Sequence, residues 1–449
     1  MALDDDDLIY SIRSAATALG NAPQDGSAVN ISALMKDLTD KYFVLLGEAT
    51  HGTREFYQAR VEITKRLIID HGITAIAIEG DWPSAARVNR YVRRQGVDAN
   101  ANEALSDFTR FPLWMWRNTV LLDFVIWLRR HNEGLPLTQQ VGFYGLDMYS
   151  MYESVAAVLE YLDRVDPDAA ADARAAYACL DRLGSERHYG YGVSLGKRAS
   201  CEEEVVRQLM SLREAGLMYA REGNVLAEDD QFEAEQNARL IQSAESYYRQ
   251  MFDRRVNTWN LRDSHMLDTL DHLHRHLTRR LQRPAKIVVW AHNSHVGDAR
   301  ATYMGERSQH TLGQLTRERY GSDACALLGF TTYTGTVTAA SDWDGPAERK
   351  RVRPALTDSL EAVFHRTGLA RFYLPLTGDI AQIFRRPRLQ RAIGVLYLPE
   401  SERASHYYEC RLNEQFDAIV HIDQTHALEP LDPTSEWVAG EQATYPFNV

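Results

Sequence analysis

The amino-acid sequence predicts an α/β fold with a mostly parallel sheet, and three observations lead to this prediction. Compact apolar runs that end near glycine occur at regular intervals over the first third of the chain. Such runs are typical of strands buried on both faces of a parallel sheet. Segments with helical spacing of apolar residues separate them, which implies βαβ units. The length of 449 residues is enough for two or three domains with a sizeable core.

The first strand and helix follow from residues 42–72. The run YFVLLG at 42–47 is apolar and closed by a glycine, as a buried strand would be. Thr53 is placed to cap a helix that runs to about Asp70, because its hydroxyl can accept a main-chain hydrogen bond. Gly72 is the expected stop, since glycine adopts the left-handed conformation at a helix end without strain.

Two more strands complete this part of the chain. TAIAIEG at 74–80 is a second buried run, and a helix opens after it with Asp81 as its cap and Pro83 in its first turn. The third strand is expected at 141–147, VGFYGLD. Between them, the aromatic stretch FTRFPLWMWRN at 108–118 is expected to open a helix.

In the rest of the chain, the predicted secondary structure changes twice, first to helices alone and then back to strands. Long amphipathic segments without strands follow Met151 and predict a helical insertion. Strand signals then return, and late strands are expected at 286–295, 324–335, 392–398 and 416–423. The predicted organisation is a three-layer α/β/α core (1–150, 261–330 and 386–430), a helical insertion (151–260), a small α+β appendage (331–385) and a C-terminal tail (431–449).

Charge and hydropathy narrow the classes of partner. The net charge of −12 argues against nucleic acid. No apolar run approaches the ~18–20 residues of a membrane span, and the N-terminal MALDDDDLIY is acidic where a secretory signal would be basic. The cysteines form no CxxC pair, which predicts reduced thiols and a cytoplasmic location. The sequence does not indicate an oligomeric state.

Carboxylates and imidazoles gather where the predicted strands end. They are Glu48, His51, Glu79, Asp81, Asp147, His292 and His295. Ligands of open α/β sheets sit at the carboxyl ends of the strands, so these side chains are expected to share one site. Any one of them alone has a structural explanation, and the coincidence across several strand ends is what indicates function.

Such a cluster can activate water. A neutral histidine, with an ordinary pKa near ~6.5, can take a proton from water and accelerate hydrolysis by ~10²–10⁴. A buried carboxylate beside it fixes its tautomer and stabilises the imidazolium that forms. A second histidine or an arginine can meet the oxyanion of a tetrahedral intermediate. The residues therefore predict hydrolysis without a covalent enzyme intermediate.

Two other interpretations compete with this one, and a separate question concerns the aromatic residues. GVSLG at 192–196 matches the GxSxG nucleophile elbow, but that motif requires a strand before it, and the region around Ser194 is polar and helical. The histidines and glutamates could instead be ligands of Zn²⁺ or Mn²⁺. Trp114 and Trp116 could line an apolar cleft for a bulky substrate, although aromatics at helical spacing more often belong to the core.

Taken in order, several motifs resemble the erythromycin esterase family. They are LLGEATHG, AIAIEGDWPSA, RFPLWMWRN, FYGLDMYS, NTWNLRDSHM and VVWAHNSHVGD. They extend from about residue 40 to 425, and their series is more specific than any single motif. The resemblance implies a three-layer α/β/α core with a helical domain, in agreement with the outline above.

The resemblance also implies roles for individual residues. His51 would be the base that activates water, with Glu48 and Glu79 as its carboxylate partners. His292, His295 and Arg60 would complete the catalytic set. Contacts with the substrate are expected from Asp147, Trp114, Trp116, Arg262 and Met266. The family implies that metal is not essential, although relatives with a GxxH motif include metal-dependent proteases.

The sequence therefore leads to the hypothesis of a cytoplasmic hydrolase that cleaves a carboxylic ester or lactone of the macrolide type. No cofactor is expected, and a divalent metal held by the same side chains is the enzymatic alternative. The non-enzymatic alternative is a small-molecule binding or accessory protein in polysaccharide or natural-product metabolism. The expected partner is a small ester or lactone, with neither nucleic acid nor a membrane.

Overall fold

The computed structural model describes residues 5–20, 31–180, 185–219 and 225–440. The chain divides into two compact units. Unit 1 consists of Met1–Ile73, Ala101–Leu128 and Lys286–Val449, and unit 2 of Thr74–Asn100 and Arg129–Ala285. The predicted tail at 431–449 is described only as far as residue 440.

The sheet of unit 1 has the strand order β1-β9-β12-β6-β2-β5. These strands are β1 (Thr17–Ala18), β2 (Phe43–Leu46), β5 (Ile287–Trp290), β6 (Cys325–Thr331), β9 (Arg371–Pro375) and β12 (Ala418–Ile422). β12, β6, β2 and β5 are parallel, and β9 is antiparallel to both of its neighbours. Every residue of β2 and β5 is buried, as expected for strands covered on both faces. The predicted α/β fold with a mostly parallel sheet is confirmed.

The other strands of unit 1 form two small sheets. They are β7 (Thr334–Ala339), β8 (Glu348–Val352) and β13 (Gln424–Thr425) in one sheet, and β10 (Arg388–Arg391) and β11 (Tyr407–Cys410) in the other. β9 falls within the predicted 331–385 appendage yet belongs to the main sheet of unit 1. The domain boundaries drawn from the sequence stay a prediction.

The helices of unit 1 are mostly short. They are α1 (Asp5–Ala15), α2 (Ser32–Leu38), α3 (Arg54–His71), α5 (Ala101–Ala104), α13 (Asn293–Val296), α14 (Tyr303–Glu306), α15 (Leu312–Tyr320), α16 (Leu360–Arg366), α17 (Gly378–Ile383), α18 (Glu402–Ser405), α19 (Leu412–Gln415) and α20 (Ser435–Ala439). The boundary between the units falls within α6 (Thr119–His131). α3 ends as predicted, with Gly72 in the left-handed conformation at φ 68°.

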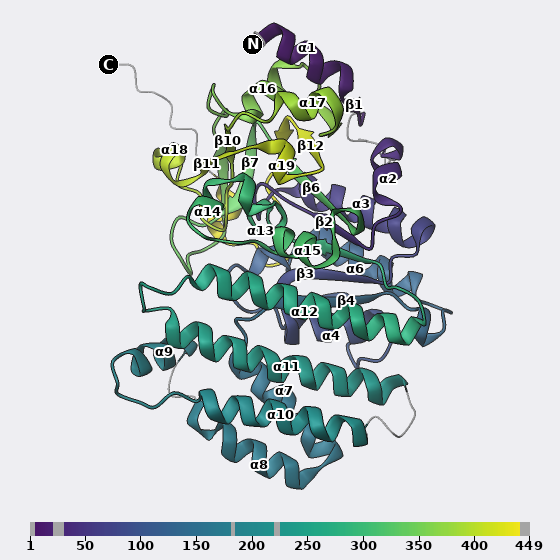
Figure 1. Cartoon of the computed structure of the whole chain (residues 1–449), viewed down its shortest axis with the longest axis vertical. Helices are drawn as coiled ribbons and strands as arrows, with labels where there is room; N and C mark the ends of the chain where they lie inside the picture. Colours follow the sequence, from purple (N-terminus) through teal and green to yellow (C-terminus); the bar gives the residue numbers. More distant parts are fainter. Residues whose placement is uncertain (1–4, 21–30, 181–184, 220–224, 441–449) are drawn as a thin grey trace. The chain divides into compact units, whose positions relative to one another are not determined.

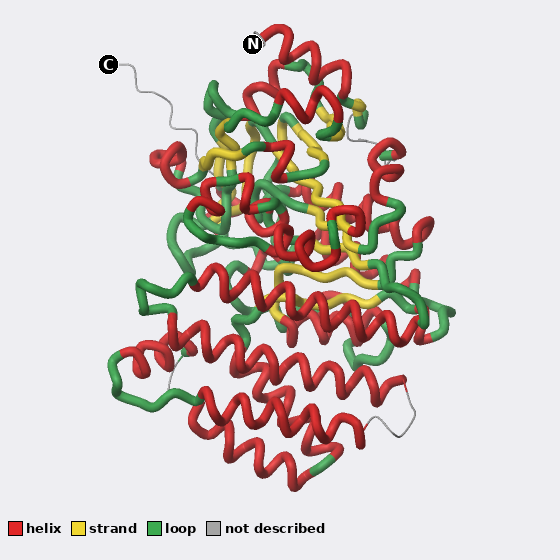
Figure 2. The backbone as a smooth tube through the Cα atoms, viewed as in Figure 1, coloured by secondary structure: helices red, strands yellow, loops and turns green. Residues whose placement is uncertain are grey.

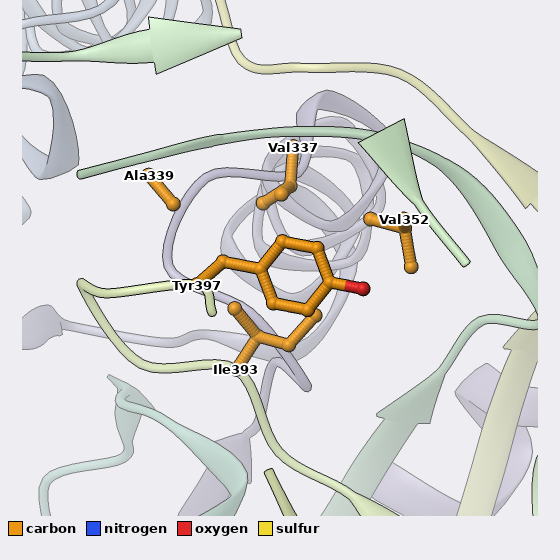
Figure 3. Close-up of a cluster of buried hydrophobic side chains, with 5 residues drawn as sticks. All are labelled: Val337, Ala339, Val352, Ile393 and Tyr397. Atoms are coloured by element: carbon orange, nitrogen blue, oxygen red, sulfur yellow. The ribbon is translucent and has the colours of Figure 1, made fainter. Parts of the chain in front are cut away.

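A buried apolar cluster joins β7 and β8 to the segment that follows β10. It consists of Val337, Ala339, Val352, Ile393 and Tyr397, and the ring of Tyr397 lies among the other side chains (Figure 3). All of these residues are fully buried. Ile393 also donates its main-chain N–H to Ala49 O at 2.8 Å, which links the cluster to the loop after β2.

Unit 2 combines a parallel strand pair with long helices. The pair is β3 (Ala75–Asp81) and β4 (Gly142–Asp147). The helices are α4 (Trp82–Val92), α7 (Met151–Val165), α8 (Pro167–Tyr177), α9 (Glu186–Ser194), α10 (Glu202–Tyr219), α11 (Val225–Gln250) and α12 (Thr258–Leu281). From α7 to α12 the described chain contains only helices and loops (Figure 2). α11 packs against α7, α10 and α12 (Figure 1).

Two predicted elements differ from the structure. The apolar run at 392–398 forms isolated bridges, Ile393 with Thr50 and Leu396 with Ala340, instead of a strand. Ile393 and Tyr397 pack in the cluster of Figure 3, and Val395 and Leu396 pack against a second buried cluster, which explains the misleading strand signal. The stretch at 108–118 opens no α-helix either. It makes a single 3₁₀ turn at Leu113–Met115 before α6 begins.

Two predicted helix caps also differ. Thr53 and Asp81 occupy the N-cap positions of α3 and α4, but neither side chain caps the helix. The Thr53 hydroxyl is hydrogen-bonded to the hydroxyl of Thr50 instead. Asp81 accepts the main-chain N–H of Tyr149 at 2.8 Å. In each case the side chain is hydrogen-bonded to another group instead of to the first N–H groups of the helix.

The prediction of reduced cysteines is wrong for one pair. Cys179 and Cys201 form a disulfide in unit 2, with their Cα atoms 5.8 Å apart. They are 22 positions apart, and packing of the described helices brings them together, so no local pattern announced the bond. Cys325 and Cys410 are free and buried in unit 1. The cytoplasmic location stays a prediction, now without full support from the cysteines.

None of the helices described here combines the length and the apolar character that a membrane crossing would require.

Candidate active site

The loop between β2 and α3 places a histidine against a carboxylate, and α3 adds an arginine to the other side of that carboxylate. His51 Nδ1 lies 2.9 Å from Glu48 Oε1, and Arg60 Nη2 lies 2.7 Å from Glu48 Oε2. All three side chains are buried. One carboxylate therefore holds an imidazole and a guanidinium at once.

Close backbone packing fixes the course of this loop. At Gly47 a side chain would collide with Asn293, and at Gly52 it would collide with the main chain of Thr338. Gly52 O accepts the main-chain N–H of Thr338 at 2.9 Å and that of Leu428 at 2.8 Å. These contacts require glycine and hold the intervening His51 in place, because the chain cannot shift past its neighbours.

Asn293 links the ends of three adjacent strands. Its main-chain N–H donates to Glu48 O at 2.8 Å, after β2. Its side chain donates to Phe330 O at 2.7 Å and accepts from Phe330 N at 3.2 Å, in β6. Asn293 itself lies three residues after the end of β5. The sequence analysis did not select Asn293, although it stands between the two histidines of AHNSH.

Two aromatic rings and a carboxylate surround the buried guanidinium of Arg60. The guanidinium carbon lies 4.2 Å from the centre of the Tyr57 ring and 5.2 Å from that of Trp290. Aromatic faces attract cations, and this attraction is stronger away from water. Arg60 is fully buried and ion-paired with Glu48, so its positive charge balances that carboxylate.

His292 stands beside His51 at the end of β5. The centres of the two rings are 4.8 Å apart, with their planes at 42°. His292 Nδ1 accepts the main-chain N–H of Ser294 at 3.2 Å, and the Ser294 hydroxyl lies 2.8 Å from the same nitrogen. His295 is buried on the short helix α13, and its main-chain N–H donates to His292 O.

Unit 2 contains a second charged cluster, at the ends of β3 and β4. Arg262 of α12 binds Asp147 with two hydrogen bonds, of 3.0 and 2.6 Å, and Glu79 with one of 2.8 Å. Its guanidinium carbon lies 5.2 Å from the centre of the Tyr149 ring. Burial alone would lower the pKa of Arg262, but Asp147, Tyr149 and Glu79 raise that pKa well above its usual value.

His265 is a buried titratable residue of unit 2 that the sequence analysis did not select. It lies one turn after Arg262 on α12, within NTWNLRDSHM, and its Nε2 is 3.3 Å from the Thr269 hydroxyl. Burial lowers the pKa of His265 to about 4, against the opposing effect of the Asp147 carboxylate. The available signal was its spacing of three from Arg262, which puts both on one face of a helix.

The structure divides the predicted site residues between the two units. Unit 1 brings together Glu48, His51, Arg60 and His292, with His295 on the same α13, and unit 2 brings together Glu79, Asp147 and Arg262. The remaining three predicted residues are core residues. Trp114 and Trp116 are buried near the 3₁₀ turn, and Met266 is fully buried on α12.

The alternative nucleophile lacks the setting that its motif needs. Ser194 is the last residue of α9 and is exposed, and its hydroxyl donates to Tyr191 O at 2.9 Å. Ser194 thus ends a helix instead of lying in the turn after a strand, so GVSLG is not a nucleophile elbow. Across the described ranges, no three side chains from His, Cys, Asp and Glu are grouped as a metal ion would require.

Comparison with known proteins identifies the family. A family model described as erythromycin esterase matches residues 68–425. The chain belongs to the erythromycin esterase family. Membership of this family supports an esterase-type hydrolase that acts on a small molecule.

Individual relatives within and around the family are distant. Erythromycin esterase type II of Escherichia coli is 23% identical over 335 residues, which cover 71% of this chain and 75% of the relative. The crystal structure of a succinoglycan biosynthesis protein matches with a TM-score of 0.73 at 20% identity, over 96% of this chain and 99% of that one. A mutant of the erythromycin esterase EreC in its open conformation matches with a TM-score of 0.65 at 18% identity, over 90% and 96%. At these identities the structural matches establish the fold.

Proposed function

We propose that the protein hydrolyses a carboxylic ester or lactone with water activated by His51, without a covalent enzyme intermediate. The observation that carries the proposal is the hydrogen bond between His51 Nδ1 and the Glu48 carboxylate, which is itself paired with Arg60. A carboxylate without a proton can only accept, so the imidazole proton lies on Nδ1 and the lone pair on Nε2. This is the tautomer that a general base needs.

The reaction has two steps. His51 Nε2 takes a proton from water as the water oxygen attacks the carbonyl carbon, which forms a tetrahedral oxyanion. Glu48 stabilises the imidazolium by its negative charge. His51 then returns the proton to the leaving alkoxide oxygen as the C–O bond breaks, and a carboxylic acid and an alcohol are released.

The other predicted residues receive supporting roles. His292, whose ring adjoins that of His51, is proposed to hydrogen-bond the oxyanion. The full burial of Arg60 favours charge balance of Glu48 over contact with the substrate. His295 is proposed to act with His292, and the roles expected of Glu79, Asp147 and Arg262 stay predictions from the sequence.

The substrate is proposed to be a lactone of the macrolide type, in line with the name of the Escherichia coli relative. A cytoplasmic enzyme of this kind would act on such an antibiotic after its entry into the cell and confer resistance.

A mass-spectrometric screen of macrolides and smaller lactones tests the proposal. The wild type should add the mass of one water to at least one compound, and His51→Ala should lower the rate by roughly 10²–10⁴. Ser194→Ala is the matched control and should retain full activity, since Ser194 takes no part. Equal activity of His51→Ala and the wild type would refute the proposal, as would a covalent acyl-enzyme trapped on Ser194.

The same assay, repeated with a chelator and combined with a binding measurement, separates the alternatives. A metal-dependent hydrolase would lose activity with a chelator and regain it with Mn²⁺ or Zn²⁺, whereas the proposed mechanism predicts no change. The name of the succinoglycan biosynthesis relative favours a second candidate, an accessory protein of polysaccharide metabolism. Such a protein would bind a ligand equally well after His51→Ala and would hydrolyse no ester.

A further inference from the structure

We infer that Ser294 is a positioning residue that holds His292 in the tautomer with its proton on Nε2, and so makes His292 a hydrogen-bond donor. The inference rests on the proposed function for its catalytic meaning, because the donor would serve the oxyanion of ester hydrolysis. The tautomer itself is a property of the resting protein and can be measured without a substrate.

The main chain around β5 and α13 supplies the first argument. α13 begins directly after His292, and the first N–H groups of a helix need acceptors from outside that helix. His292 provides one, since its Nδ1 accepts the Ser294 main-chain N–H at 3.2 Å. A main-chain N–H can only donate, so Nδ1 must carry a lone pair. In the neutral ring, the single proton is then on Nε2.

The Ser294 side chain supplies the second argument. Its hydroxyl oxygen lies 2.8 Å from His292 Nδ1, closer than the main-chain nitrogen. Because Nδ1 already accepts from the main chain, the hydroxyl is also oriented to donate to it. Two donors from one residue therefore converge on Nδ1, and both disfavour a proton there.

The adjacent histidine has the opposite arrangement. Glu48 can only accept, so His51 carries its proton on Nδ1 and its lone pair on Nε2. The two rings, 4.8 Å apart between centres, are thus complementary tautomers. One can take a proton from water and the other can donate a hydrogen bond to the charge that develops. This assigns the base and the oxyanion donor, which the sequence alone left open.

Nitrogen NMR of the full chain labelled with ¹⁵N-histidine tests the inference. The two neutral tautomers have distinct ring-nitrogen shifts in long-range ¹H–¹⁵N spectra, and His292→Gln identifies the His292 signal by its loss. The wild type and Ser294→Thr, which keeps the hydroxyl, should both show the Nε2–H form at neutral pH. Ser294→Ala should show a measurable share of the Nδ1–H form. A wild-type His292 with a proton on Nδ1 would overturn the inference.

Kinetics of the same variants on the ester found by the screen give a second readout. Ser294→Ala should lower kcat by roughly 2- to 10-fold with little change in KM, the effect of one lost neutral hydrogen bond, and Ser294→Thr should restore it. An unchanged kcat together with an unchanged tautomer in Ser294→Ala would also overturn the inference. If the wild type hydrolyses no ester, the proposed function fails while the NMR result still decides the tautomer.

Discussion

Each unit of this protein contains a buried cluster of arginine and carboxylate groups, and the two clusters differ in how the charges are shared. In unit 1, the Glu48 carboxylate divides its oxygens between Arg60 and His51. In unit 2, the Arg262 guanidinium divides its nitrogens between Asp147 and Glu79. The first cluster has one carboxylate for one arginine, and a histidine is hydrogen-bonded to that carboxylate. The second cluster has two carboxylates for one arginine.

Under the proposed function, this difference separates the cluster that moves a proton from the one that holds charge in place. In unit 1, the charge of Arg60 balances that of Glu48, and the same carboxylate is hydrogen-bonded to the imidazole that the proposed function makes the base. In unit 2, the two hydrogen bonds between Arg262 and Asp147 form a rigid planar pair. If the proposed function holds, the comparison teaches that the number of carboxylates for each arginine, and not only the residue types, distinguishes a cluster that does acid–base chemistry from one that does not.

The strongest test of the comparison removes the arginine from unit 1. Arg60→Met conserves volume but leaves the Glu48 carboxylate buried without its cation, which should lower the free energy of unfolding by about 3–5 kcal/mol. Urea unfolding of the variant and the wild type measures this loss. Because Glu48 would then draw a second proton onto His51, hydrolysis should fall as well.

Two further variants make this test specific. Arg66→Met is the control on the same helix. The Arg66 side chain is 47% exposed and pairs with Glu62 at 3.5 Å, so its loss should lower the free energy of unfolding by less than about 0.5 kcal/mol. Arg60→Met combined with Glu48→Gln removes both charges and should regain part of the stability without regaining activity. If Arg60→Met proved no more harmful than Arg66→Met, the charge balance assigned to Arg60 would be wrong.

The next prediction concerns the pH dependence of unit 2, where His265 is buried as a neutral ring. Burial lowers its pKa to about 4, while an unfolded histidine has a pKa near ~6.5. The unfolded chain therefore binds a proton in this window that the folded chain does not. Stability should fall as the pH drops from ~6.5 towards 4, by on the order of 3 kcal/mol for this residue, and should be unaffected by it at higher pH.

Comparison with a non-titrating variant isolates this contribution. His265→Gln should lose less stability than the wild type between pH 7 and pH 4.5 when both are unfolded by urea. The charged groups that act on His265 are Asp147, which favours the protonated ring, and His272 and Arg239, which oppose it. Identical pH profiles for the wild type and His265→Gln would show that His265 is already protonated or solvated in the folded state.

The parts of the site that the sequence could predict are those set by local chemistry. Glu48 and His51 follow an apolar run closed by Gly47, and His292 follows another, so their place at strand ends could be read from the order of residues alone. Parallel strands then bring such ends to one edge. This reasoning needs no knowledge of side-chain contacts between distant segments, and it therefore succeeded at the ends of β2 and β5.

The parts that could not be predicted depend on partners far along the chain. The sequence could not show that Asp81 would lose its capping role to the main-chain N–H of Tyr149, which lies 68 positions later. The bond between Cys179 and Cys201 likewise depends on how helices pack. The choice among these partners is made by tertiary packing, for which a single sequence carries no direct signal.

The smallest expected effect tests the rigidity of the cluster in unit 2. Arg262→Lys keeps the positive charge but loses the planar pair of hydrogen bonds to Asp147, and it should cost about 1–2 kcal/mol of unfolding free energy. Arg255→Lys is the matched control, because Arg255 forms the same paired geometry with Asp253 while 89% of its side chain is exposed. Water screens that pair, so its loss should have no measurable effect on unfolding. Only 16% of the Arg262 side chain is exposed, so equal losses for the two variants in urea unfolding would mean that Arg262 acts as a simple point charge. A larger loss at Arg262 would show that the geometry of the guanidinium, and not its charge alone, holds the second cluster together.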